Sequence, residues 1–260
     1  MTPQSALSEL RSQAPLVHCI TNYVAMNIAA NAVLAAGASP AMIHANEEVA
    51  DFAPMAGALT INIGTLSAPW AEAMHAAAGA AHAAGVPWVL DPVAHFATPY
   101  RAGVARALLE HRPAIVRGNA SEILALADEK STGRGADSGD SVEVAREAAR
   151  RLAHDRGCVV VVTGETDLAT DGARIAAVSG GSALMPKVTA LGCALTALVG
   201  GYAAVAAPLE ASVAALAHFA EAGERAAQGA DGPGSFTVRF LDQLHAVQPA
   251  DLDGARVAWG

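Results

Sequence analysis

The chain has 260 residues, of which 53% are hydrophobic, only 4% are aromatic and 64 are alanine. This length allows a large core, and such small side chains favour many closely packed helices. Its formal net charge of −9, with no cluster of Lys and Arg, argues against nucleic acid or an anionic membrane surface as a partner. The most apolar stretch, 191–209, is rich in Ala and Gly and predicts a buried helix rather than a membrane span.

The N-terminal residues and the cysteines indicate a cytoplasmic protein. Residues 1–15 are polar and mixed in charge, without the apolar core of a secretion signal. Cys19, Cys158 and Cys193 are odd in number and far apart. They predict neither a disulfide framework nor a cysteine zinc site, and they fit a reducing compartment.

Apolar runs alternate with longer Ala-rich segments over the first two-thirds of the chain. Strands are expected at 16–20, 41–43, 58–63, 87–90, 114–117 and 158–163. Helices are expected at 23–36, 48–56, 68–84, 100–110, 121–127 and 141–156. The strands are continuously apolar, which is typical of strands buried on both faces. This alternation predicts an α/β domain with a parallel sheet between helices.

The pattern changes after residue 163. Short runs at 167–170 and 174–178 flank Asp171-Gly172, which predicts a hairpin, and helical patterns follow at 193–206, 209–228 and 236–246. Residues 128–140 are polar and Gly-rich, which favours a solvated loop, with a lid over a ligand as the lesser alternative. We expect a single domain over 1–260, with a frayed polar tail from about residue 249.

Polar residues follow five of the expected strands. They lie at 21–22, 62–65, 91–92, 117–119 and 163–165. One such residue is ordinary, because helix N-caps favour Asn, Asp, Ser and Thr. Five together predict the rim of an active site, since ligands bind beyond the carboxyl ends of parallel strands.

No common nucleotide-binding signature is present, neither GxxxxGK[ST] nor GxGxxG. The best phosphate site is therefore the segment 189–197, where Gly192 allows close backbone approach and a helix begins. Cys193 lies in the first turn of that helix, whose positive end should lower the thiol pKa. The alternative for Cys193 is a small buried hydrophobic residue.

Asn119 and Glu122 open another helix after a strand. A capping box explains this spacing without any function. The functional alternative is that Glu122 and Asp91 order the waters of a bound Mg²⁺, which needs only one or two carboxylates besides phosphate oxygens.

Several of these segments resemble the hydroxyethylthiazole kinase family. The matching motifs occur in order between about residues 15 and 245, and together they are specific although each alone is weak. They are LVHCITN (16–22), GASPAM (37–42), NIGTL (62–66), LDPV (90–93), RGNASE (117–122), VTGE (162–165), GCAL (192–195), and ER (224–225) with GPGSF (232–236).

The resemblance implies a ribokinase-like three-layer sandwich and a homotrimer with active sites between subunits. It implies transfer of the ATP γ-phosphate, with Mg²⁺, to the hydroxyl of 4-methyl-5-(2-hydroxyethyl)thiazole in thiamine salvage. Three alternatives stay open: a kinase of a related heterocyclic alcohol, a weakly active thiazole- or nucleotide-binding homologue, and an enzyme that uses Cys193 as a covalent nucleophile.

The resemblance also implies roles for individual residues. Cys193 matches the catalytic base, and the expected thiazole contacts are Met42, Asn22 and the backbone of Ala190. The remaining positions are those expected at ATP, namely Arg117, Thr163, Asn119 and Gly192, and those expected near Mg²⁺, namely Asp91 and Glu122.

Two departures from the family pattern bear on rate and substrate choice. The family usually has Gly-Thr-Gly-Cys where this chain has Ala190-Leu191-Gly192-Cys193. Ala190 can serve there if its φ is negative, whereas Leu191 removes a hydroxyl near the transferred phosphate. Phe96 replaces a usual Gly and is expected to narrow the site or to move its loop.

Overall fold

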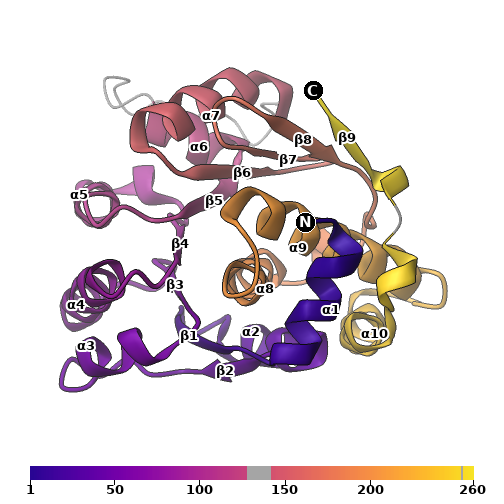
Figure 1. Ribbon diagram of the computed structural model, residues 1–260, viewed down its shortest axis with the longest axis horizontal. Helices are drawn as coiled ribbons and strands as arrows, with labels where there is room; N and C mark the ends of the chain where they lie inside the picture. Colours follow the sequence, from indigo (N-terminus) through magenta and orange to yellow (C-terminus); the bar gives the residue numbers. More distant parts are fainter. Residues whose placement is uncertain (128–141, 253) are drawn as a thin grey trace.

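The computed structural model describes residues 1–127, 142–252 and 254–260 (Figure 1). Within these ranges nine strands form one sheet in the order β2-β1-β3-β4-β5-β6-β7-β8-β9. The strands are β1 (Leu16–Ile20), β2 (Ser39–Ala41), β3 (Ala58–Asn62), β4 (Trp88–Asp91), β5 (Ile115–Asn119), β6 (Val159–Thr163), β7 (Asp167–Thr170), β8 (Ile175–Val178) and β9 (Val257–Trp259).

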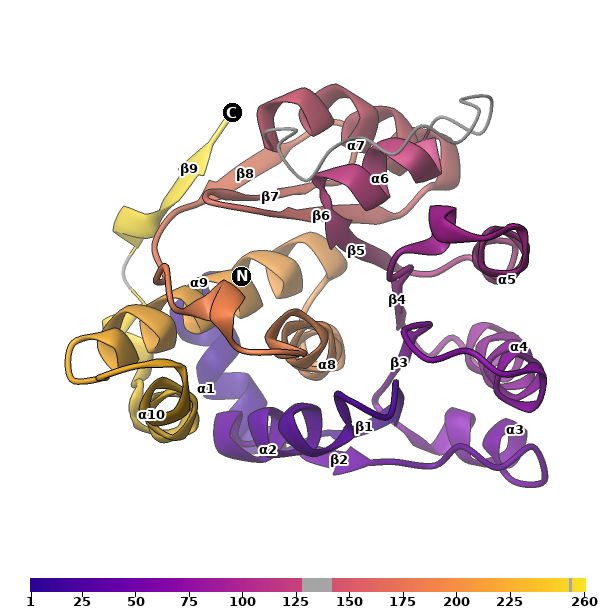
Figure 2. The same ribbon diagram turned by 180° about the vertical axis from the view of Figure 1, so that it is seen from behind.

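Helices cover both faces of the sheet, so the molecule has three layers (Figures 1 and 2). One apolar core joins the sheet to α3, α4, α5, α6 and α7, and the other joins it to α1, α2, α8, α9 and α10. The α-helices are α1 (Pro3–Gln13), α2 (Met26–Ala36), α3 (Val49–Phe52), α4 (Ala68–Ala83), α5 (Pro99–Leu109), α6 (Ala120–Ala127), α7 (Val142–Arg156), α8 (Leu191–Ala203), α9 (Pro208–Ala227) and α10 (Pro233–Ala246). The 3₁₀ helices are η1 (Ala53–Met55), η2 (His95–Ala97), η3 (Met185–Lys187), η4 (Pro249–Asp251) and η5 (Gly254–Arg256).

The sheet is parallel from β2 to β6 and antiparallel from β6 to β9. Parallel pairing brings the carboxyl ends of β1, β3, β4, β5 and β6 to one edge. The register places Asn62 opposite Asp91, and Asn119 opposite Thr163. Polar residues that are distant in sequence therefore become neighbours at that edge.

Small residues allow helix α8 to lie close to the sheet. A Cβ at Gly200 would overlap the Cγ2 atom of Thr60 in β3. Eleven of the residues of α8, including Leu191 and Ala194, are buried. This close approach carries the N-terminus of α8 to the polar edge of the sheet.

The α/β fold class and the hairpin at 171–172 are confirmed, whereas several element boundaries differ from those expected. The second strand is Ser39–Ala41 rather than 41–43, and the helix expected at 48–56 is divided into α3 and η1, which has a proline in its first turn. Helix α1 was not predicted. The loop predicted at 128–140 lies outside the described residues.

The prediction of a frayed tail from about residue 249 is wrong. Residues 249–251 form η4, and β9 pairs with β8 in a register that places Val257 opposite Val178. A three-residue strand has too little pattern to be found from sequence, and it is stable here because β8 supplies its hydrogen-bonding partner.

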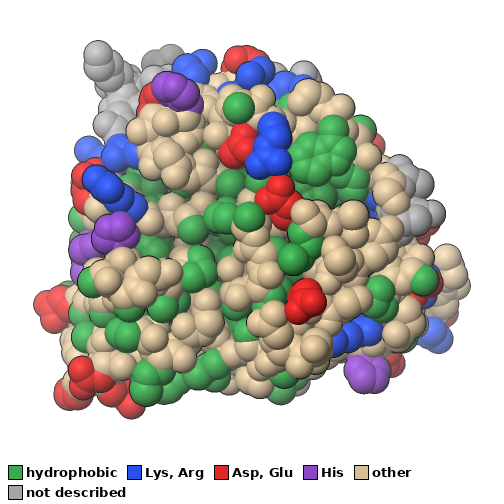
Figure 3. Space-filling model, viewed as in Figure 1, with side chains coloured by type: hydrophobic (Ala, Val, Ile, Leu, Met, Phe, Trp, Pro, Cys, Tyr) green, Lys and Arg blue, Asp and Glu red, His purple; other side chains and the backbone are tan. Residues whose placement is uncertain are grey.

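Figure 3 shows the charged side chains on one face of the molecule. On the face in Figure 3, Lys and Arg side chains are scattered among acidic and apolar ones. No helix in the described ranges is long and apolar enough to cross a membrane.

Candidate active site

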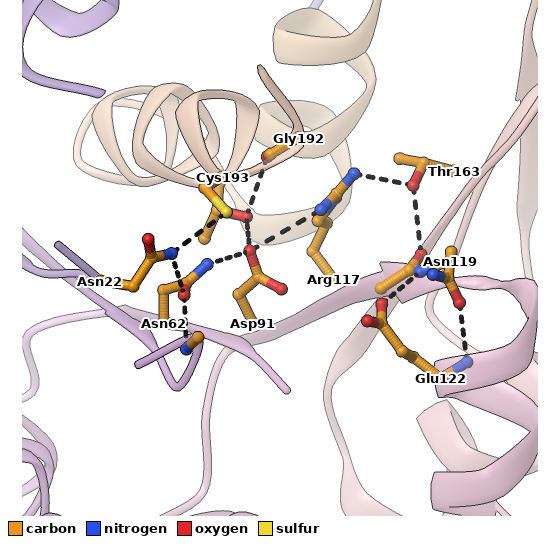
Figure 4. A network of polar contacts seen from close by, with 12 residues as sticks. Asn22, Asn62, Asp91, Arg117, Asn119, Glu122, Thr163, Gly192 and Cys193 are labelled. Carbon is orange, nitrogen blue, oxygen red and sulfur yellow. Dashed lines mark hydrogen bonds and ion pairs between the residues drawn. The ribbon is translucent and has the colours of Figure 1, made fainter. Parts of the chain in front are cut away.

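Asp91, the last residue of β4, is at the centre of a buried polar network (Figure 4). Its Oδ2 atom accepts hydrogen bonds from Asn62 Nδ2 at 2.6 Å and from Thr196 Oγ1 at 2.7 Å, and lies 3.7 Å from Arg117 Nη1. Its Oδ1 atom is buried and has no hydrogen-bond partner among the described residues. Burial raises the pKa of Asp91 to about 6, against the opposing effect of the Arg117 charge.

Cys193, in the first turn of α8, faces one side of this network. Asn22 Nδ2, which follows β1, donates to Asn62 Oδ1 at 2.8 Å and to Cys193 Sγ at 3.4 Å. Burial, and then the Asp91 carboxylate, raise the pKa of the Cys193 thiol. The shift is therefore upward, opposite to the lowering expected from the helix end, and its main causes are desolvation and the neighbouring Asp91 carboxylate.

Arg117 of β5 lies on the other side of Asp91, against the start of α8. Its Nη2 atom donates to Thr163 Oγ1 at 2.8 Å. A Cβ at Gly192 would be 3.0 Å from Nη2 and 3.1 Å from Nη1 of Arg117. Gly192 therefore lets the guanidinium pack directly on the backbone of the helix N-terminus, where unpaired N–H groups favour an anion.

Asn119 and Glu122 form the capping box that their spacing allows. Glu122 Oε2 accepts from the Asn119 N–H at 2.8 Å, and Asn119 Oδ1 accepts from the Glu122 N–H at 2.9 Å. Glu122 Oε1 accepts from the N–H of Ala94, which lies in the loop after β4, at 2.9 Å. The Glu122 carboxylate thus ties the start of α6 to that loop.

The backbone at Ala190 differs from the expectation. Ala190 is the N-cap of α8 and has φ 60° and ψ 9°, in the left-handed region, so the condition of a negative φ is not met. Leu191 is buried and lines a cleft together with Leu195 and Phe219. Phe96 is 39% exposed and does not line this cleft.

This cleft, of about 790 Å³, opens beside Arg117. It lies between the ends of β5 and β6, the loop from β8 to α8, and helix α9. Its volume suits a nucleotide-sized ligand. Its lining includes Arg117, Asn119, Thr163, Gly192, Leu195 and Phe219.

Met42 directly follows β2, the edge strand beside β1. His44 Nδ1 is 3.0 Å from the carbonyl oxygen of Met42, and the N–H of Thr21 donates to His44 Nε2 at 3.3 Å. The two contacts place the proton on Nδ1 of a neutral ring, and burial lowers the pKa of His44. Trp70 stacks on this ring, with ring centroids 4.7 Å apart. The ends of β1 and β2 are therefore joined through His44.

Arg101 of α5 joins two further loops at this edge. Its guanidinium donates to the carbonyl oxygens of Ile63 at 2.7 Å and Gly64 at 3.2 Å, after β3. It also donates to the carbonyl oxygens of Val93 and Ala94, after β4. These bonds explain how the irregular backbone at the site keeps its shape.

Most of the residues selected from sequence are brought together in one polar network, and Met42 lies outside it. The connected set contains Asn22, Asp91, Arg117, Asn119, Glu122, Thr163, Gly192 and Cys193 (Figure 4). Sequence reasoning missed Thr196, His44 and Arg101. Thr196 had a signal, since it lies four residues after Gly192 and its side chain is polar in a helix that is otherwise mostly apolar.

Comparison with solved structures defines the class of protein. The pyridoxal kinase of Staphylococcus aureus in complex with AMP-PCP and pyridoxal aligns with a TM-score of 0.59 at 16% identity, over 80% of this chain and 87% of that one, which shows the fold. The hydroxyethylthiazole kinase protein from Pyrococcus horikoshii OT3 aligns with a TM-score of 0.93 at 39% identity, over 99% of this chain and 98% of that one. The predicted ribokinase-like fold is confirmed, and the chain is a kinase of this class.

The sequence comparisons identify the family. The profile of the hydroxyethylthiazole kinase family matches residues 7–250. Hydroxyethylthiazole kinase of Roseobacter denitrificans is 63% identical over 252 residues, which are 97% of this chain and 98% of that protein. Hydroxyethylthiazole kinase of Gemmatimonas aurantiaca is 62% identical over 260 residues, which are 100% of this chain and 94% of that protein. The chain belongs to the hydroxyethylthiazole kinase family.

Proposed function

We propose that this protein transfers the γ-phosphate of ATP to the hydroxyl of 4-methyl-5-(2-hydroxyethyl)thiazole, as a step of thiamine salvage. The observation that carries the proposal is the continuous network from Asn22 and Cys193 through Asp91 to Arg117 and Thr163. It links Asn22 and Cys193, which we assign to the acceptor, to a nucleotide-sized cleft across the N-terminus of α8. Phosphoryl transfer requires chiefly such positioning and charge neutralisation.

ATP is assigned to the cleft beside Arg117. The Arg117 guanidinium packs against Gly192 and donates a hydrogen bond to Thr163. It can therefore contact phosphate oxygens next to the free N–H groups at the start of α8. Asn119, at the end of β5, lines the same cleft. These cationic and N–H groups stabilise the negative charge of the transferring group.

The thiazole alcohol is assigned to the other side of Cys193. Asn22 holds its side chain between Asn62 and the thiol, and Met42 lies at the end of the neighbouring strand. The backbone of Ala190 is the third proposed contact. Bound there, the substrate hydroxyl would lie next to Cys193 Sγ.

Cys193 is the proposed base for the hydroxyl proton. Its raised pKa means that the thiolate is scarce at neutral pH, so turnover should rise with pH as the thiol ionises. A general base contributes about 10²-fold at the low end of its range. Cys193→Ala should therefore slow turnover by about this factor and leave the KM for ATP nearly unchanged.

Mg²⁺ is the proposed metal, and Asp91 and Glu122 are the residues assigned to it. Asp91 fits a hard cation, because its Oδ1 atom is a buried carboxylate oxygen without a hydrogen-bond partner in the described part of the chain. No group of three or more His, Cys, Asp or Glu side chains suited to a metal occurs in the described ranges, so phosphate oxygens and water would complete the shell. When bound, the ion would neutralise phosphate charge.

A homotrimer with active sites between subunits is also part of the proposal. Tyr23 and Val24 follow Asn22 directly and are 65% and 56% exposed. Apolar side chains exposed next to a substrate site fit a surface that another subunit covers. Light scattering coupled to size exclusion measures the oligomer.

The free cysteines fit a reducing cytoplasm as the compartment.

A coupled ATPase assay with and without the thiazole alcohol tests the function. We expect ATP turnover that depends on the alcohol and on Mg²⁺, and that falls in Cys193→Ala. Turnover with a related heterocyclic alcohol but not with the thiazole would identify a different acceptor. ATP-independent covalent labelling of Cys193 by an electrophilic substrate would contradict the kinase mechanism.

A further inference from the structure

One wall of the cleft contains none of the residues assigned to the reaction. Gly180, Gly181 and Ser182 form it together with Phe219 and Ala220 of α9. The two glycines follow β8 and have φ of 120° and 88°, in a region that other residues rarely adopt. The shape of this wall therefore depends on what packs behind the glycine backbone.

Two side chains fill the space behind the glycines. A Cβ at Gly180 would overlap Nη1 of Arg256, and a Cβ at Gly181 would be 2.8 Å from Sδ of Met185. Met185 lies in η3, within the same connection between β8 and α8 as the glycines, whereas Arg256 comes from the C-terminal segment just before β9. Arg256 is thus the contact that ties the loop to a distant part of the chain.

The Arg256 guanidinium is held by α9, the other component of the wall. Its Nε donates to Glu221 Oε2 at 2.8 Å and its Nη1 donates to Glu224 Oε2 at 2.7 Å, while Nη2 also pairs with Glu221. Glu221 directly follows Ala220, which lines the cleft. In addition, the N–H of Ser179 donates to the carbonyl oxygen of Arg256 at 3.0 Å.

The network continues away from the cleft. Glu221 Oε1 accepts from Arg225 Nε at 2.5 Å, and Arg225 pairs with Asp251 of η4 at 3.0 Å. Because Glu221 and Arg256 are mostly buried, their ion pairs are less screened than exposed ones. The C-terminal segment is therefore attached to α9 at two points, through Asp251 and through Arg256.

We propose that Arg256 is a positioning residue for the nucleotide, which it holds indirectly by fixing the loop 180–182 against α9. The inference rests on the proposed role of the cleft as the ATP site. All three guanidinium nitrogens face Glu221 or Glu224, so Arg256 does not contact the nucleotide itself. Without it, binding must order the loop, and that ordering reduces affinity.

The test compares Arg256→Ala with Arg106→Ala, which removes the same charge from an exposed position of α5 outside the cleft and away from Glu221 and Glu224. Calorimetry with ATP, without the thiazole alcohol, measures nucleotide affinity apart from turnover. In Arg256→Ala we expect the dissociation constant and KM for ATP to rise about tenfold, as one poorly ordered loop would cost. The kcat and the KM for the alcohol should stay close to wild type, and Arg106→Ala should change none of these values.

A second variant tests the contact with the loop. Gly180→Ala should weaken ATP binding by displacing the guanidinium, and it should cost less in Arg256→Ala than in the wild type because the overlap is gone. Arg256→Lys, which can keep one ion pair, should give an intermediate loss and serves if Arg256→Ala does not fold. The inference about Arg256 is overturned if both Arg256 variants bind ATP as tightly as the wild type. It is also overturned if Gly180→Ala weakens ATP binding equally in the wild type and in Arg256→Ala. Either result leaves the assignment of ATP to the cleft untouched. Failure of the wild type to bind ATP overturns the nucleotide assignment as well.

Discussion

Ala190→Gly should make the protein more stable. Ala190, the N-cap of α8, has φ 60° and ψ 9°, a conformation in which the Cβ atom crowds the following carbonyl. Glycine has no Cβ and adopts this conformation freely. The change leaves in place the hydrogen bond from the Ala194 N–H to the carbonyl of residue 190, at 3.0 Å.

The size of the gain is the difference between two opposing effects. Left-handed backbone costs a residue with a Cβ about 1–2 kcal/mol. Glycine gives the unfolded chain more freedom, which takes back about 0.4–1 kcal/mol. The free energy of unfolding should therefore rise by about 0.5–1 kcal/mol. In a chain of this size, each kcal/mol raises Tm by roughly 2–4 °C.

Urea unfolding of Ala190→Gly measures this gain, and Ala14→Gly is its control. Ala14 ends α1 with φ 43° and ψ 54°, is exposed, and lies outside the active-site network. The same backbone argument applies to it, so both variants should gain stability. A gain in Ala14→Gly alone would mean that contacts of the Ala190 methyl group offset its strain. A gain in neither variant would refute the argument from backbone conformation.

Three further substitutions test the site. Gly192→Ala would place a methyl group 3.0 Å from Arg117 Nη2, so the KM for ATP should rise about tenfold, given an overpacking cost of about 1–3 kcal/mol; unchanged kinetics would contradict the contact. Gly64→Ala would place a methyl group 2.6 Å from Asn22 Nδ2, so steady-state kinetics should show a raised KM for the thiazole alcohol rather than for ATP. The pKa of Asp91, raised to about 6, means that its contribution to stability is present below about pH 4 and lost as pH rises through about 6. Asparagine does not ionise, so the free energy of unfolding of Asp91→Asn, measured in urea, should increase relative to that of the wild type by about 2–3 kcal/mol between about pH 4 and pH 8. If the difference between the two proteins stays constant over this range, ionisation of Asp91 does not destabilise the fold.

The parallel part of the fold could be predicted because its signals are local. Strands β1, β3 and β6 are mostly apolar, and polar residues end or directly follow each of them, where the shared edge of the sheet brings these residues together. Helix α1 and strand β9 lacked such signals. Helix α1 is mostly polar, and it is held by the few apolar residues that pack against the rest of the molecule.

The proximity of the selected residues was predicted better than their properties. Asn22, Asp91 and Cys193 meet as expected, because each follows a strand or begins α8. The direction of the Cys193 pKa shift was missed, since the helix end is visible in sequence but burial and the distant Asp91 carboxylate are not. The backbone of Ala190 was missed because nothing in an alanine indicates a left-handed φ.

The position of β9 bears on how the protein is made. The strands β1 to β5 are completed early in synthesis and pair with near neighbours in the chain. The wall of the cleft is completed later, because Gly180 is supported by Arg256, which is synthesised long after strands β1 to β5. A ribosome-bound chain can thus assemble most of its sheet while the cleft is still open on one side, so nucleotide should bind with full affinity only after the C-terminal segment has left the ribosome.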